Sequence, residues 1–197
     1  MLDVAKSDAP KVKLRTVDKR VAGRRATETR DRILEALTDL LGSMSYRNVR
    51  VTDVVREVGT SPATFYQYFA DVETAVLALA TDLGKESAGL KTAGSGARNA
   101  TAAVDQVING VAAFVKKNEP ILRVTDTASA EGDKRFQKVR ATVLANVASG
   151  LAVQGAKTKE VAGNADVLAA MLLANPSDAA AARRLVHQGV TGRKPTG

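Results

Sequence analysis

Residues 59–69 read Gly59-Thr60-Ser61-Pro62-Ala63-Thr64-Phe65-Tyr66-Gln67-Tyr68-Phe69, and this stretch decides the fold. Its opening glycine can adopt the left-handed conformation that ends a helix. The serine and proline that follow are typical of a helix start, because serine caps free backbone N–H groups and proline has no N–H to satisfy. The stretch therefore predicts that one helix ends at Gly59 and that another begins at Pro62.

The segment before it predicts a short helix. Thr52 is a good N-cap, and Val54, Val55 and Val58 follow at the i, i+1, i+4 spacing of one helical face. Valines also favour strands, but this spacing behind a capping residue argues for a helix. Two short helices joined by a turn of about three residues form a helix-turn-helix.

The second of these helices has two faces. Phe65 and Phe69 lie at i and i+4 and are expected to fix the helix to the core. Four aromatic residues within five positions cannot all face inward. The residues expected to face outward are Pro62, Ala63, Thr64, Gln67 and Tyr68.

Amphipathic helices are predicted on both sides of this unit. Upstream, apolar residues recur at helical spacing from Ile33 to Met44, and Gly42-Ser43 marks the end. Thr27 or Thr29 is the expected N-cap of that helix. Downstream, an aspartate is expected to cap a helix with five apolar residues on its inner side. These residues are Asp71, as the cap, and Val72, Val76, Leu79, Ala80 and Leu83.

The second half of the chain predicts a helical bundle. Residues 84–96 contain several glycines and predict a flexible joint or a frayed helix end, so we place a domain boundary there. Further helices are expected at 98–117, 120–128, 134–153, 159–174 and 178–189, with Asn118 and Asp133 as caps. The predicted fold is all-α. It comprises a disordered basic arm over 1–23, a helix-turn-helix domain over 24–83, a bundle over 84–189 and a disordered tail over 190–197.

Composition excludes several chemistries. The 197 residues carry a formal net charge of +8 and include no cysteine and a single histidine, His187. Disulfides, thiolate nucleophiles and Cys-type zinc sites are therefore excluded, as are HExxH pairs and His-based triads. The longest uncharged run, residues 141–156, is too short and too polar for a membrane span of about 20 apolar residues. No secretory signal is visible, so we expect a soluble cytoplasmic protein without cofactor or metal.

The positive charge is concentrated at the N-terminus. Residues 1–30 hold nine Lys and Arg against four acids, whereas residues 31–97 are net acidic. Two interpretations of this arm stay open. It is either a solvated tail or an arm attracted to a polyanion, because Lys and Arg release counterions from phosphates.

From Arg30 to Leu79 the sequence resembles the TetR family of bacterial transcriptional regulators. The motifs that carry the resemblance are Thr52-Asp53-Val54, Val58-Gly59, Ser61-Pro62 and the run from Thr64 to Phe69. The sequence departs from the family at Thr60, where members usually have an aliphatic residue, and at Val72, where a lysine near DNA phosphate is common. The resemblance implies a homodimeric repressor. Residues 24–83 would bind double-stranded DNA, and residues 84–189 would dimerise and bind a small-molecule effector that releases a palindromic operator.

Candidate base contacts lie at the leading edge of the second short helix, which enters the major groove in a helix-turn-helix. Pro62, Ala63 and Thr64 are suited to thymine methyl groups, and Gln67 to adenine. Other residues are suited to the DNA backbone, because hydroxyls, arginines and helix N-termini bind phosphates. These are Arg24, Arg25, Arg30, Thr52, Ser61, Tyr66 and Tyr68.

The effector site is less well marked. Phe114 and Phe136 are the only aromatic residues beyond residue 90, so a mainly apolar ligand is expected. The candidate pocket residues are Phe114, Ile121, Leu122, Phe136, Val139 and Met171. Glu131 and Asp133 look like capping residues, and the helices at 159–174 and 178–189 are the dimer candidates.

Two other classes of function stay open at this point. A non-specific, architectural nucleic-acid-binding protein would use the basic arm, although the net acidic helix-turn-helix region argues against it. A small helical enzyme or interaction module would have to rely on carboxylate, Lys, Ser or Tyr chemistry, and no such pair is convincingly placed.

Overall fold

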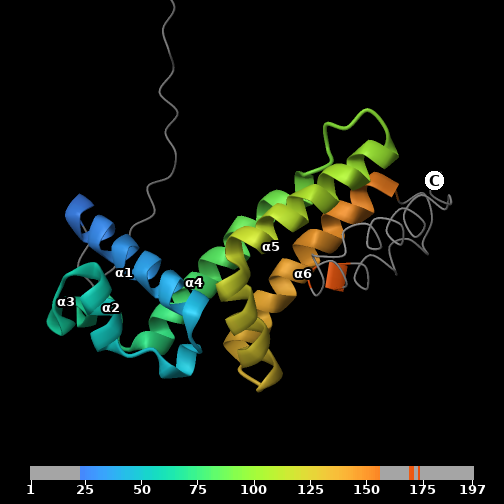
Figure 1. The fold of residues 1–197 in the computed structure, drawn as a ribbon. Coiled ribbons are helices and arrows are strands. Elements are labelled where there is room, and N and C mark those ends of the chain that lie inside the picture. The colour runs from blue at the N-terminus through green and yellow to red at the C-terminus, as the bar shows by residue number, and fades with distance from the viewer. Residues whose placement is uncertain (1–22, 156–168, 171–172, 174–197) are drawn as a thin grey trace, which may run out of the picture.

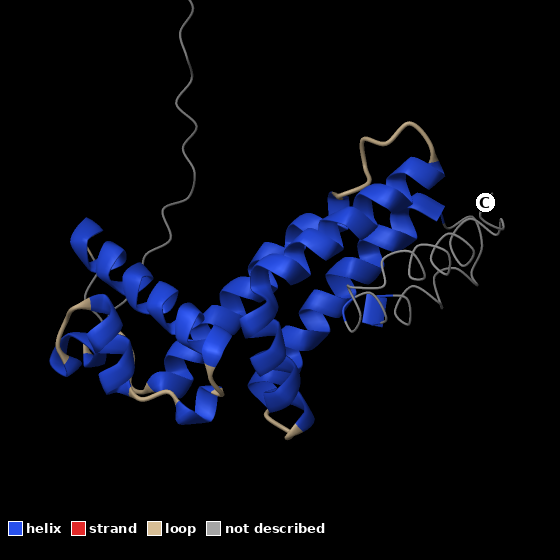
Figure 2. Ribbon diagram, viewed as in Figure 1, coloured by secondary structure: helices blue, strands red, loops and turns tan. Residues whose placement is uncertain are grey.

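The computed structural model of the chain describes residues 23–155, 169–170 and 173. Helices α1, α2 and α3 form a head at one end, and α4 leads from it to two long antiparallel helices, α5 and α6 (Figure 1). The bounds are α1 Arg24–Ser43, η1 Tyr46–Asn48, α2 Val51–Val58, α3 Pro62–Tyr66, α4 Val72–Glu86, η2 Ser87–Thr92, α5 Ala100–Ala130 and α6 Lys134–Gly155. The described segments are helices and connecting turns (Figure 2), which confirms the all-α prediction.

The core of the head follows from the apolar periodicity of its helices. Side chains from all four N-terminal helices meet in it and are shielded from water, which supplies most of the stability of such short helices. The buried residues with the least exposure include Ile33, Leu37, Leu41, Val54, Phe65, Ala75, Val76 and Ala80. Burial of Val54, Val55 and Val58 confirms that the valine-rich segment is a helix and not a strand.

Two of the expected helix starts are wrong. Helix α1 begins one turn earlier than predicted, at Arg24, so Thr27 and Thr29 lie inside it and donate their hydroxyls to the carbonyls of Gly23 and Arg25. Helix α2 begins at Val51, which places Thr52 within its first turn. Asp53 provides the cap interaction instead, because its Oδ2 accepts the backbone N–H of Arg50 at 3.1 Å.

Residues 84–92, expected to form a loose joint, are packed against α6. Gly84 is buried within α4, and Ser87 and Leu90 are buried in η2. Asn146 Nδ2 donates to Ser87 Oγ at 2.6 Å, and that hydroxyl donates to the carbonyl of Gly84 at 2.7 Å. The segment is therefore packed rather than loose, and Gly84 lies against Val139 and Thr142 of α6.

The predicted break near Asn118 is a kink inside one long helix. Asn118 has non-helical backbone angles, with φ −111° and ψ 15°, and Pro120 follows inside α5. Proline lacks an N–H and clashes with the carbonyl four residues earlier, which bends a helix. Asn118 Nδ2 donates to the carbonyl of Phe114 at 3.0 Å, so its side chain stabilises the bend.

Hydrogen bonds and an ion pair near the C-terminal end of α5 connect the bundle to the head. Arg123 donates to the carbonyl of Leu41 in the last turn of α1, where the helix dipole also favours a cation. Arg47, within η1, forms an ion pair with Glu131, which raises the pKa of the Arg47 guanidinium. Glu131 was expected to be a capping residue, and it is the C-cap of α5, while its carboxylate also forms this cross-connection.

Asp133 is the cap of α6, as predicted. Its Oδ1 accepts the backbone N–H of Arg135 at 2.9 Å. The guanidinium of the same arginine contacts this carboxylate and lowers the pKa of Asp133 to about 2. Arg135 also pairs with Glu73 of α4, so the turn between α5 and α6 is tied to the helix that leaves the head.

Several predictions fall outside the described residues. These are the arm over 1–22, most of the helix at 159–174, the helix at 178–189 with His187, and the tail. Ala169, one of the few described residues there, is buried in the core, and Leu173 packs against it. No helix among the described residues has the length and apolar character needed to cross a bilayer.

Candidate nucleic-acid interface

The turn between α2 and α3 has the predicted geometry. Gly59 adopts the left-handed conformation, with φ 71° and ψ 43°, and the N–H of Thr60 bonds the carbonyl of Val55 at 2.9 Å. A residue with a Cβ is strained in that conformation, so glycine is required there. Ser61 Oγ accepts the N–H of Thr64 at 3.2 Å, and Pro62 is the first helical residue. These interactions set the angle at which α3 leaves α2.

A long-range hydrogen bond supports the same turn from α1. Arg32 Nη2 donates to the carbonyl of Val58, the last residue of α2, at 2.6 Å. This carbonyl belongs to the group of helix-terminal acceptors that lack intrahelical donors, and a cation near a helix C-terminus is favourable. Arg32 therefore holds α1 and the end of α2 in a fixed relation just before the turn.

Replacing Arg32 by methionine should destabilise the protein by about 1 kcal/mol, because a charged donor is lost while the aliphatic stem is kept. Urea unfolding of the full chain, followed by circular dichroism, measures this change. Lys85→Met is the control, since it breaks an exposed ion pair with Asp82 and should change stability by less than about 0.5 kcal/mol. Equal effects of the two variants would contradict a bracing role for Arg32.

Aromatic packing fixes the inner side of α3. Phe65 is fully buried and Phe69 nearly so, as predicted, and their ring centroids lie 5.8 Å apart at an interplanar angle of 47°. Tyr66 meets the edge of Phe65, also at 5.8 Å between centroids, while remaining 51% exposed. Of these two neighbouring aromatic residues, Phe65 therefore lies in the core and Tyr66 at the surface.

The outer side of α3 carries most of the residues predicted to face outward. Pro62, Ala63 and Gln67 are exposed. Thr64 is half-buried, and its Oγ1 lies 3.1 Å from Ser61 Oγ. Tyr68 is also half-buried and packs against the core, so its ring is less available than that of Tyr66. The structure therefore brings small, amide and phenol groups together on one open surface, which we call the α3 surface: Ser61, Pro62, Ala63, Tyr66 and Gln67.

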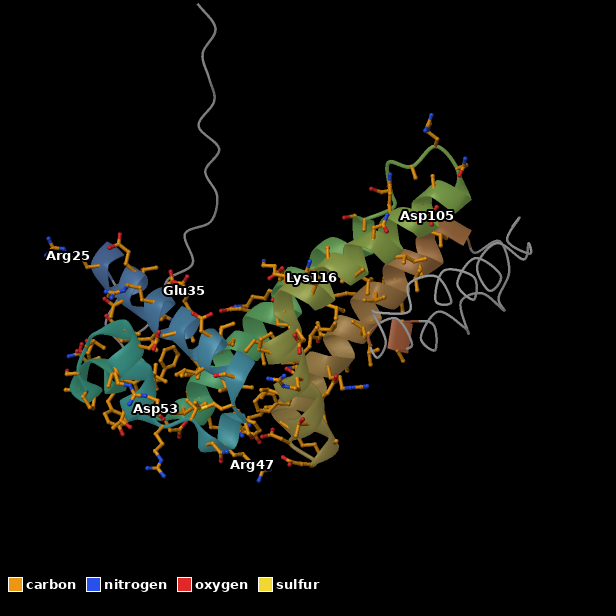
Figure 3. All side chains as sticks on the ribbon, in the orientation of Figure 1. Arg25, Glu35, Arg47, Asp53, Asp105 and Lys116 are labelled. Atoms are coloured by element: carbon orange, nitrogen blue, oxygen red, sulfur yellow. The ribbon has the colours of Figure 1, made fainter. Side chains whose placement is uncertain are left out.

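The three candidate arginines occupy different positions. Arg25 is exposed at the free end of α1, where Figure 3 shows its side chain directed away from the helix. Arg24 is the first residue of the same helix. Arg30 instead packs within the head: its guanidinium lies 5.6 Å from the centroid of the Phe69 ring and within 4 Å of the carboxylates of Asp31 and Asp82.

A further basic residue lies beside the candidate phosphate contact at the start of α2. Thr52 is exposed in the first turn, and Arg50, directly before the helix, is exposed as well. Arg50 is not among the contacts predicted from the sequence. It could have been found from its position directly before a helix N-terminus, because backbone N–H groups and a neighbouring cation there can bind the same anion.

The described candidate pocket residues are not gathered around any one of the cavities described between these residues. Phe114, Ile121 and Phe136 are buried in the core, and Val139 is half-buried beside it. Leu122 lines a small cavity between α5 and α6, and Met171 lies outside the described residues. Within the part of the chain that the structure describes, no three His, Cys, Asp or Glu side chains are grouped as a metal site would require.

In the part of the chain that the structure describes, a helical fold with a helix-turn-helix and an open outer surface on its second short helix defines the class of helix-turn-helix DNA-binding regulators. Residues 33–78 match the family model described as bacterial regulatory proteins, tetR family, and residues 89–175 match the model of the tetracyclin repressor-like C-terminal domain. The chain belongs to the TetR family of transcriptional regulators. Members are DNA-binding regulators without enzymatic activity, so the protein is a regulator and not an enzyme.

Solved structures have the same fold at low sequence identity. GusR of Salmonella enterica is 16% identical with a TM-score of 0.60, covering 83% of this chain and 95% of that one. The fatty acid degradation regulator FadR from Bacillus halodurans is 14% identical with a TM-score of 0.61, covering 89% and 100%. A TetR transcriptional regulator from Rhodococcus sp. RHA1 is 15% identical with a TM-score of 0.51, covering 84% and 95%. Among proteins of curated function, none matches the sequence significantly.

Proposed function

We propose that the protein is a homodimeric repressor that binds a palindromic operator through the α3 surface and is released by a small, mainly apolar ligand. In this proposal residues 24–83 form the DNA-binding domain, residues 84–189 dimerise and bind the ligand, and the protein acts in the cytoplasm, where bacterial DNA lies. The observation that carries the proposal is the exposure of Pro62, Ala63 and Gln67 on a helix held from behind by buried Phe65.

Base recognition is assigned to the exposed residues of the α3 surface. Pro62 and Ala63 are small and apolar, which suits the methyl group of thymine, and the amide of Gln67 can pair with adenine. Thr64 is a weaker candidate, because its hydroxyl lies beside that of Ser61. These contacts would determine which operator sequence the protein prefers.

Backbone contacts are assigned to residues around that surface. The Tyr66 hydroxyl, the hydroxyl and N–H groups at Thr52, and the guanidinium of Arg50 are placed at exposed positions that suit phosphates. Arg24 and Arg25 stay candidates for the DNA backbone or minor groove. Arg30 is left out, because its guanidinium is engaged with Phe69 and two carboxylates.

A dimer would present two α3 helices to successive major grooves. Two-fold symmetry then requires half-sites about one helical turn apart, ~34–36 Å, or somewhat more. Light scattering at micromolar concentration tests the dimer, and a monomer would contradict it. The ligand-release step is tested separately, by adding cell metabolites to the protein–DNA complex.

The first test is fluorescence anisotropy with labelled DNA from upstream of the protein's own gene, against random DNA of equal length. A specific regulator should bind the upstream fragment at least about a thousandfold more tightly at physiological salt. A steep salt dependence with almost no preference between the fragments would instead support a non-specific architectural protein.

The α3 surface is tested by two variants that should behave differently. Gln67→Ala should reduce the preference for particular base pairs about 10-fold or more while changing binding to random DNA little. Tyr66→Phe removes only a hydroxyl, and should weaken binding to all sequences alike, by about threefold to tenfold. Anisotropy on the operator and on single-base variants measures both effects. Equal losses for both variants on specific and random DNA would contradict these assignments.

A further inference from the structure

Two buried hydroxyls on α5 have no hydrogen-bond partner among the described residues. Four polar side chains are buried among the described residues: Ser87, Thr125, Ser129 and Asn146. Ser87 and Asn146 bond each other, but Thr125 Oγ1 and Ser129 Oγ have no partner in the part of the chain that the structure describes. Thr125 is only 1% exposed and Ser129 only 8% exposed. A buried hydroxyl without a partner is costly, so two of them one turn apart require an explanation.

These hydroxyls do not use the acceptors that their own helix offers. Helical Ser and Thr commonly bond the carbonyl four residues earlier, as Thr127 does with Arg123 at 2.9 Å and Thr142 does with Lys138 at 2.9 Å. At Ser129 the backbone carbonyl is satisfied by Gln137 Nε2 at 3.0 Å, yet the hydroxyl of the same residue is unpaired among the described residues. The two hydroxyls therefore remain available to donate to a ligand.

Thr125 and Ser129 both line hollows between α5 and α6, and their hydroxyl oxygens are buried at the edge of these hollows. Thr125 lines a cavity of about 40 Å³ with apolar walls that include Leu122, Val143 and Leu173. Ser129 lines an adjoining open groove of about 600 Å³. The two hollows share Asp126, Arg140 and Leu144 as walls, so they adjoin, and together we call them the α5–α6 pocket.

An arginine stands where the two hollows meet. Arg140 Nε donates to Asp126 Oδ1 at 2.8 Å, and both side chains are about half exposed, which makes the pair weak and easily rearranged. This is the only hydrogen bond of the guanidinium to a described residue, so its Nη groups can bind a second carboxylate. The residues around the pocket thus include two with unpaired hydroxyls and the Arg140–Asp126 ion pair, and a ligand carboxylate would take the place of Asp126 on the guanidinium.

We propose that the α5–α6 pocket binds a monocarboxylate with an apolar body. The carboxylate accepts hydrogen bonds from Thr125 and Ser129 and pairs with Arg140, while the apolar body lies against Leu122, Val143 and Leu144. Binding of this ligand does not depend on the proposed function; only the statement that the ligand is the effector rests on it. The assignment adds the chemical class of that ligand and the three side chains that recognise its charged end.

The binding test uses the full chain without DNA and three probes of equal length: decanoate, decan-1-ol and decylamine. Isothermal titration calorimetry should show saturable binding of decanoate, at least about tenfold tighter than decanol, and no binding of decylamine. Decanol binding as tightly as decanoate would overturn the carboxylate assignment. Absence of saturable decanoate binding up to millimolar concentration would overturn the pocket assignment.

Variants that remove one donor each test the recognition. Thr125→Val, Ser129→Ala and Arg140→Gln should each weaken decanoate binding about tenfold or more, because each removes a charge-assisted hydrogen bond. Thr127→Val is the matched control, since that hydroxyl bonds its own helix on the exposed side, and decanoate affinity should not change. Unchanged affinity in Thr125→Val would overturn the proposal.

The same variant gives a second readout of opposite sign. Thr125→Val replaces an unpaired buried hydroxyl by a methyl group of similar shape, so the free protein should melt about 2–4 °C higher even though it binds decanoate more weakly. A lower melting temperature would show that the hydroxyl already has a partner, and would overturn the argument. If decanoate binds through Thr125 but leaves DNA affinity unchanged, the pocket stands and the proposed release step fails.

Discussion

Replacing Gly150 by alanine should destabilise the protein by about 2–4 kcal/mol, although alanine is the better helix former. A Cβ at this position of α6 would lie 2.3 Å from the carbonyl oxygen of Leu90 and 3.3 Å from its carbonyl carbon. Both atoms are backbone, so no side-chain rotation can relieve the clash, and η2 and α6 must separate. That separation would also disturb the nearby Ser87–Asn146 hydrogen bond, which joins the same two elements.

Gly110 provides the matched control for this prediction, because it approaches the same segment from α5. A Cβ there would lie 3.5 Å from Leu90 Cδ2 and 3.6 Å from Ala93 Cβ, which is ordinary van der Waals contact. Gly110→Ala should therefore stabilise the protein by about 0.5–1 kcal/mol through helix propensity. Urea unfolding at one fixed protein concentration compares the variants, since any dimerisation makes stability concentration-dependent. A Gly150→Ala protein as stable as the parent would show that the close approach is not a constraint.

The head was predictable because its signals are local. Gly59, Ser61 and Pro62 each impose a backbone requirement within a few residues of themselves, and the turn between α2 and α3 has the predicted form. The helix starts at Thr27 and Thr52 were less predictable, because several residues near a helix end can provide the cap. At α2 the carboxylate of Asp53 accepts the N–H of Arg50 and determines where the helix begins. In the sequence, Thr52 next to it is an equally good cap candidate.

The segment after α4 could not be predicted from its glycines, because their role depends on a partner far along the chain. Gly84 is buried against Val139 and Thr142 of α6, and such a contact over more than fifty residues leaves no local signal. The same holds for Arg30. From the sequence, Arg30 precedes the apolar residues of α1 and is expected to be a free cation. In the fold its guanidinium instead contacts the ring of Phe69 and the carboxylate of Asp82. Long-range contacts therefore distinguish the structural arginine Arg30 from the arginines that we propose as DNA contacts.

Replacing Phe65 by alanine should cost about 3–5 kcal/mol and abolish tight binding to the operator and to random DNA together. Phe65 is one of the two largest fully buried side chains among the described residues, and it lies in a five-residue helix that is too short to be stable without this packing. Its loss should leave a cavity beside Phe69 and release α3. Urea unfolding measures the stability change, and hydrogen exchange should show lost protection in α2 and α3 while α5 and α6 stay protected.

The control for Phe65→Ala is Gln67→Ala, because Gln67 lies two residues further along the chain and is exposed. Because Gln67 has no part in the core, its removal should leave unfolding within about 0.5 kcal/mol of the parent and change only base preference. Phe65→Leu should fall between the two, since most of the apolar volume is kept. Tight operator binding by a Phe65→Ala protein would mean that α3 is not positioned by its buried face, and the assignment of base contacts to the opposite face would fail with it.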